Sequence, residues 1–144
     1  MDGKAKDALL LMVKACDALS NLHAEADVSA APVVATAVSG TWLALIAGQP
    51  AEAVRLGERA LIPLEETHAG RPHPLRVNLA HGYLLQGRLD EAKNIYTRYA
   101  GTQFEDGRGW NEEVLNDFKL LSAAAHDHGD MKKIEALLPI DTKE

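Results

Sequence analysis

The chain has 144 residues, of which 47% are hydrophobic and 25% are charged, and its formal net charge is −6. These values are ordinary for one globular domain, residues 1–144, and the scattered basic residues offer no binding surface for nucleic acid or anionic lipid. No apolar run is long enough to span a bilayer, and the single cysteine, Cys16, cannot form an internal disulfide. We therefore expect a cytoplasmic protein without nucleic-acid or membrane partners.

The first predicted helix covers residues 4–24, where apolar residues recur three or four positions apart. Its apolar stripe runs from Leu9 through Cys16 to Leu22 or His23. Because this stripe occupies one face, the helix needs a partner that buries it.

A very apolar helix is predicted next, from Pro32 to about residue 47. It is apolar nearly all round, so we expect it to be buried on several sides. Gly48 and Pro50 separate it from a third helix, which Pro63 should shorten or kink. After the Gly- and Pro-rich loop at 67–74, further helices are predicted over residues 74–86, 89–99, 111–127 and 131–138.

A short motif occurs twice between consecutive predicted helices, as GQPAEA at residues 48–53 and as GRLDEA at residues 87–92. Gly129 heads a third segment at the corresponding place. A glycine there lets one helix end in a left-handed conformation, and a small residue such as Ala53 or Ala92 lets the next helix approach closely. The chain is therefore predicted to contain three antiparallel helical hairpins, each with its glycine at the turn.

These residues resemble the tetratricopeptide repeat (TPR), a 34-residue helical hairpin repeat. In the central unit, residues 73–106, the matching positions are Asn78, Leu79, Ala80, Tyr83, Gly87, Ala92 and Tyr96. Arg76 stands at the place of an early tryptophan, Tyr99 at that of a small residue, and Phe104 at that of a closing proline. The preceding unit covers residues 34–67, and a degenerate or capping hairpin covers residues 111–138.

The resemblance implies an all-α fold in which antiparallel hairpins stack as a short TPR-like α-solenoid of about seven helices. It also implies a non-enzymatic scaffold that binds a protein or peptide segment in a concave helical groove. The residues expected to line this groove are Val38, Trp42, Leu45, Val77, Asn78, His81, Leu84 and Lys119. Two alternatives stay open, because Trp42 could pack in the core against the first helix and Asn78 could form a hydrogen bond between helices.

The residues that could carry chemistry do not form a known motif. Six histidines are present, and the pair in HDHGD, His126 and His128, would point to different sides of a helix terminus. Cys16 lies on an apolar stripe, and no phosphate-binding loop or hydrolase motif occurs. We expect no catalytic residue, metal or cofactor. The alternatives are a homodimer formed through the apolar helix at residues 33–47 and a histidine-based metal-dependent enzyme.

Overall fold

The computed structural model describes residues 3–25 and 29–140, and these ranges hold helices, one isolated bridge between Gln103 and Gly109, and no β-strand. The helices are α1 (Gly3–Ala24), α2 (Ala30–Ile46), α3 (Pro50–Arg59), α4 (Leu61–His68), α5 (Pro74–Leu85), α6 (Leu89–Arg98), α7 (Trp110–Ala123) and α8 (Met131–Leu137). The predicted all-α class is confirmed. None of these eight helices is both long and apolar enough to cross a membrane.

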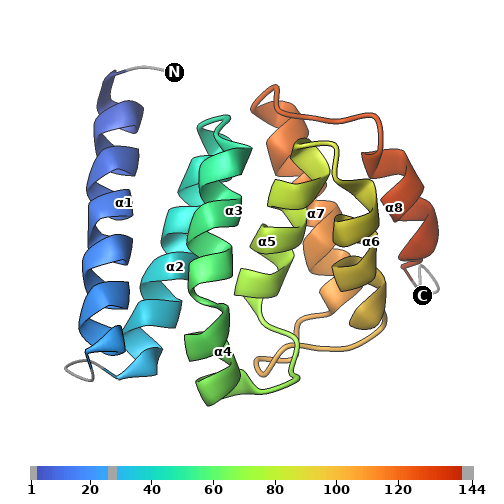
Figure 1. Ribbon diagram of the computed structural model, residues 1–144. Coiled ribbons are helices and arrows are strands. Elements are labelled where there is room, and N and C mark those ends of the chain that lie inside the picture. Colours follow the sequence, from blue (N-terminus) through green and yellow to red (C-terminus); the bar gives the residue numbers. More distant parts are fainter. Residues whose placement is uncertain (1–2, 26–28, 141–144) are drawn as a thin grey trace.

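The helices lie side by side, with α1 at one end of the molecule and α8 at the other (Figure 1). α2 contacts α1, α3, α4 and α5, which agrees with the expected burial of this apolar helix on several sides. α5 is similarly central, because it contacts α2, α3 and α6. α7 meets its neighbours mainly through long side chains, such as Phe118 beside Tyr96, and less through close backbone approach.

The turns that follow α2 and α5 have the conformation predicted from their glycines. Gly48 has a φ of 75° and Gly87 a φ of 79°, so both are left-handed. At the first turn the Gln49 N–H donates to the Ala44 carbonyl at 2.8 Å, and the second turn repeats this pattern. These hydrogen bonds satisfy carbonyl groups that the end of a helix would otherwise leave without partners.

The third turn differs from the prediction. Ala125, with a φ of 64°, adopts the left-handed conformation, and Gly129 does not. The His126 N–H donates to the Leu121 carbonyl at 2.8 Å, which is the same hydrogen bond as in the other two turns. Because this turn closes at Ala125, α7 ends at Ala123 and not near residue 127.

The helix predicted after Pro50 is divided into α3 and α4 at Ala60. Pro63 has no N–H, and its ring crowds the carbonyl of the preceding turn, which interrupts the regular helical hydrogen bonding. The Ala60 N–H donates to the Gly57 carbonyl at 3.2 Å, a tighter turn than an α-helix makes. This break is why the described residues hold eight helices instead of about seven.

Glycines bring neighbouring helices very close at two crossings. A Cβ atom added to Gly40 would lie 2.7 Å from the Cys16 sulfur, and one added to Gly82 would lie 2.8 Å from a methyl group of Val54. α1 therefore packs on α2, and α5 on α3, at distances that a larger residue would not allow. The small residues predicted to permit close approach at the turns are also fully buried, namely Ala53 and Ala92.

Candidate functional site

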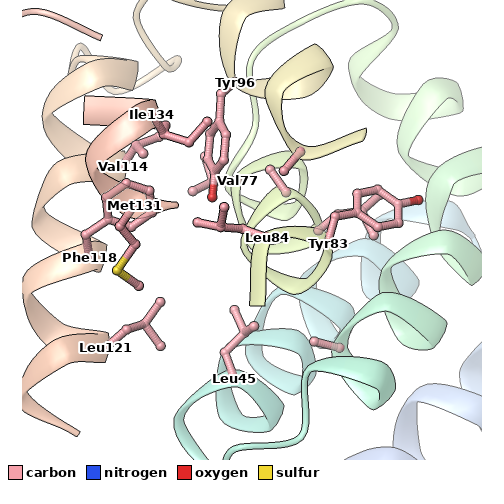
Figure 2. Packing of buried hydrophobic residues seen from close by; sticks show 14 of the residues in the cluster. Leu45, Val77, Tyr83, Leu84, Tyr96, Val114, Phe118, Leu121, Met131 and Ile134 are labelled. Atoms are coloured by element: carbon pink, nitrogen blue, oxygen red, sulfur yellow. The ribbon is translucent and has the colours of Figure 1, made fainter. Parts of the chain in front are cut away.

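Most residues predicted to line an open groove lie in the core. The five concerned are at most 5% exposed, and they are Leu45, Val77, Asn78, His81 and Leu84. Figure 2 shows Leu45, Val77 and Leu84 among the other buried side chains. Their predicted place on an open surface is therefore wrong, because α2, α3, α6 and the long side chains of α7 cover the sides of these helices on which the five residues lie.

The other three predicted groove residues are not fully buried. Val38 and Trp42 are half-buried on α2, and Lys119 is exposed on α7. The Trp42 ring lies 6.5 Å from the His81 ring and packs against the core cluster. The structure thus brings Trp42 close to His81, but it buries five of the eight predicted groove residues.

Asn78 forms a hydrogen bond between helices, as its alternative interpretation predicted. Its Nδ2 donates to the Val38 carbonyl at 3.1 Å and to Thr41 Oγ1 at 3.0 Å. The Thr41 hydroxyl in turn donates to the Ala37 carbonyl at 2.7 Å. Because these partners all belong to α2, Asn78 joins α5 to α2 inside the protein.

His81 connects three helices through a buried chain of hydrogen bonds. Its Nδ1 lies 2.6 Å from the Tyr96 hydroxyl, and its Nε2 lies 3.0 Å from Asp117 Oδ2. Every partner is satisfied when Tyr96 donates to Nδ1 and the Nε2–H donates to the carboxylate. Burial, together with the nearby Asp117 charge, raises the pKa of the Tyr96 hydroxyl well above its usual value. This enclosed chain stabilises the core, since His81 and Tyr96 have no exposed surface.

The remaining histidines lie in turns and helix ends, and three of them lie close to acidic side chains, namely His23, His68 and His128. His68 Nε2 lies 3.3 Å from Glu105 Oε2, and His128 Nδ1 lies 3.7 Å from Asp130 Oδ2. Within residues 3–25 and 29–140, no group of three or more His, Cys, Asp or Glu side chains could hold a metal ion. Burial and the neighbouring Asp17 charge raise the pKa of the Cys16 thiol to about 11, so this cysteine is not a thiolate near neutral pH.

An exposed apolar surface that the sequence analysis did not predict lies on the side of α1 away from α2. Leu11 is 68% exposed and Leu22 is 40% exposed, although the sequence placed either Leu22 or His23 on the inner stripe. A row of exposed residues with alternating spacings of three and four runs along this side, and we call it the outer stripe: Ala8, Leu11, Ala15, Ala18 and Leu22. That spacing is the heptad pattern by which one helix packs against another.

Comparison with protein-family models, with curated proteins and with solved structures finds no match for this chain. The TPR resemblance therefore depends on the residues of the central unit, and membership of that family stays a prediction.

Proposed function

We propose that the protein is a non-enzymatic, TPR-like helical-repeat module that assembles with a second copy of itself through the outer stripe of α1. The repeated sequence motif supports the repeat architecture, and so does the hydrogen-bonded turn shared by Gly48, Gly87 and Ala125. In this proposal the helix pairs stack as a short solenoid. The five buried residues that were predicted to line the groove, which we call the inner row (Leu45, Val77, Asn78, His81 and Leu84), hold the pairs together instead of binding a partner.

The exposure of the outer stripe carries this proposal. The opposite side of α1 is already used, because Cys16 packs at Gly40 of α2. Leu11 nevertheless stays 68% exposed in the outer stripe, and Leu22, two residues before the end of α1, is 40% exposed. Burying a leucine side chain contributes about 1.5–3 kcal/mol, so a partner that covers this stripe is favoured.

The spacing of the outer stripe favours a helix as the partner, and its charges favour a second copy in antiparallel orientation. Asp7 precedes Ala8 and Lys14 precedes Ala15, so these charges flank the stripe at equivalent places one heptad apart. In an antiparallel pair, Asp7 of one copy faces Lys14 of the other, twice by symmetry, and the paired part of the outer stripe is then Ala8, Leu11, Ala15 and Ala18. The alanines leave room for the larger Leu11 side chain of the opposing helix.

This surface replaces the one expected for a homodimer. The sequence pointed to the apolar helix at residues 33–47, but the corresponding α2 contacts four other helices, and none of the exposed large hydrophobic residues of the described chain belongs to it. α1 is the helix with a side left uncovered, because it packs on the rest of the protein from one side only (Figure 1). Self-association through α1 would cover its other side.

Light scattering with size-exclusion chromatography tests the proposed function. We expect the unmodified chain to have twice the monomer mass and Leu11→Asp to be a monomer with the same helical circular dichroism. Leu120→Asp is the matched control, because Leu120 is 47% exposed but lies on α7, which α1 does not adjoin (Figure 1). A monomeric unmodified chain, or a Leu11→Asp variant that dimerises as well as Leu120→Asp, would contradict the proposal.

A further inference from the structure

A cleft of about 380 Å³ lies between α4 and α6, with α5 at its floor. Neither α3 nor α4 packs closely against α6, and the break at Ala60 separates α4 from the straight course of α3. Leu79 and Arg76 of the floor are 2% and 7% exposed, so the cleft reaches into the buried part of the protein. Its volume is in the range of sites that bind small molecules.

Each of the three helices contributes one aliphatic side chain to the cleft. These are Leu61 from α4, Leu79 from α5 and Ile95 from α6. Together they make an apolar wall, which favours a ligand with a hydrocarbon or aromatic part.

Most charged groups of the cleft already have partners. The Arg76 guanidinium donates to Glu65 at 2.5 Å, and this interaction lowers the pKa of the Glu65 carboxyl. Glu91 accepts two hydrogen bonds from Arg88, at 2.7 Å and 2.6 Å. These pairs neutralise one another, so they leave little net charge for a ligand.

Three polar side chains of the cleft have no such partner within the described part of the chain. The Asn94 amide and the Arg98 guanidinium form no side-chain hydrogen bond or ion pair there. The Tyr99 hydroxyl is buried without a hydrogen-bond partner, although Tyr99 lines the cleft and is 5% exposed. A buried hydroxyl without a partner lowers stability, and a ligand oxygen in the cleft would remove that penalty. Arg98 is the one charged residue of the cleft without an ion pair among the described residues, and its positive charge also helps to lower the pKa of the Glu65 carboxyl.

We propose that this cleft binds a small amphipathic carboxylate. The apolar part of the ligand packs on Leu61, Leu79 and Ile95, and its carboxylate accepts hydrogen bonds from Arg98 and Tyr99. A guanidinium fits a carboxylate well because its N–H groups form a planar fork. Arg98 lies over the Tyr99 ring, 5.6 Å from its centre. Binding requires the side chains that cover the hydroxyl to move. Arg98 itself is exposed and forms no hydrogen bond or ion pair with the described residues, so it can turn toward a ligand.

Sodium octanoate is the probe that tests this proposal, with 1-octanol and octylamine as probes of equal chain length and different charge. Titration of the full-length, isotope-labelled chain, followed at the Asn94 side-chain amide by NMR, should give a saturable shift with octanoate alone. We expect Arg98→Gln to weaken octanoate binding about ten-fold and Tyr99→Phe to weaken it about three-fold. Lys93→Gln is the matched control on the exposed side of α6 and should bind like the unmodified chain.

Three results would overturn the proposal: no saturable shift with octanoate, equal binding of 1-octanol, or undiminished binding by Arg98→Gln. The thermal unfolding midpoint of Tyr99→Phe separates a binding role from a structural one, because loss of an unbonded hydroxyl should leave the midpoint unchanged or raise it. A clear drop would overturn the role of Tyr99. The monomeric Leu11→Asp variant should still bind octanoate, so this test is independent of self-association.

Discussion

The His81 imidazole lies 3.0 Å from the Asp117 carboxylate, and this contact links α5 to α7 at a depth where His81 has no exposed surface. The Tyr96 hydroxyl occupies the other ring nitrogen, so three helices share one fully bonded polar chain. α7 makes few close backbone contacts with its neighbours. The polar chain therefore fixes where α7 sits relative to α5 and α6.

Replacing His81 by phenylalanine should destabilise the protein by about 3–5 kcal/mol, because it leaves the buried Asp117 carboxylate without its partner. Urea unfolding followed by circular dichroism measures this change. In the double variant His81→Phe, Asp117→Leu, no charge stays buried, so its loss of stability should be smaller than that of His81→Phe alone. A double variant as unstable as the sum of the two single variants would contradict the proposed coupling.

Gly82→Ala should destabilise the protein by about 1–3 kcal/mol, since the new Cβ would meet the Val54 side chain. The added atom would lie 2.8 Å from a Val54 methyl group. Gly129→Ala is the comparison: a Cβ there has no heavy atom within 4 Å, and Gly129 is not left-handed. Its effect should stay within about 0.5 kcal/mol. Equal effects of the two variants in urea unfolding would show that α3 and α5 do not approach as described.

Stability should fall as the pH decreases through the range in which His73 titrates differently in the folded and unfolded chain. Burial, with His68 and Arg76 nearby, lowers the pKa of His73 from 6.5 to about 4. The unfolded chain therefore binds a proton between about pH 6.5 and about pH 4 while the folded chain does not, and folding loses roughly 1–3 kcal/mol over that range.

His73→Asn tests this pH dependence, because asparagine does not titrate and can still accept the Leu75 N–H at the start of α5, which His73 accepts at 3.1 Å. We expect the free energy of unfolding to change less between about pH 7 and about pH 4.5 in the variant than in the unmodified chain. Parallel pH profiles of the two proteins would argue against the lowered pKa.

Reversing the charge of Asp7 or of Lys14 should weaken the proposed dimer roughly ten-fold, because each change places like charges opposite one another at two symmetric positions. The double variant Asp7→Lys, Lys14→Asp should restore dimerisation, since it exchanges the partners without removing the attraction. Analytical ultracentrifugation measures the dissociation constants. Lys132→Asp, on the exposed side of α8 at the other end of the molecule, is the control. Failure of the double variant to recover would exclude the antiparallel arrangement.

The turns could be predicted from sequence where a local residue decides them. Gly48 and Gly87 favour a left-handed conformation by themselves, so the first two turns were predicted correctly. Ala125 has no such preference, and it adopts that conformation because α7 ends there and its carbonyl groups need partners. The sequence therefore favoured Gly129 as the left-handed residue of the third turn, and this prediction is wrong.

The burial of the inner row could not be predicted, because it depends on how far side chains from a distant segment reach. Nothing near His81 in the sequence indicates that Asp117 meets it. The TPR resemblance places the inner row on an open surface. That placement would require α7 to leave this surface uncovered. The outer stripe of α1, by contrast, follows a spacing that is visible in the sequence from Ala8 to Leu22. The prediction assigned only one apolar stripe to this helix, and that stripe is the buried one.

The position of the Cys16 sulfur against Gly40 provides a chemical reporter for α1. The thiol is 5% exposed and is the only cysteine of the chain, so maleimide reagents should modify it only when α1 separates from α2. The labelling rate of the native protein would then measure how often this end helix detaches, with no engineered probe.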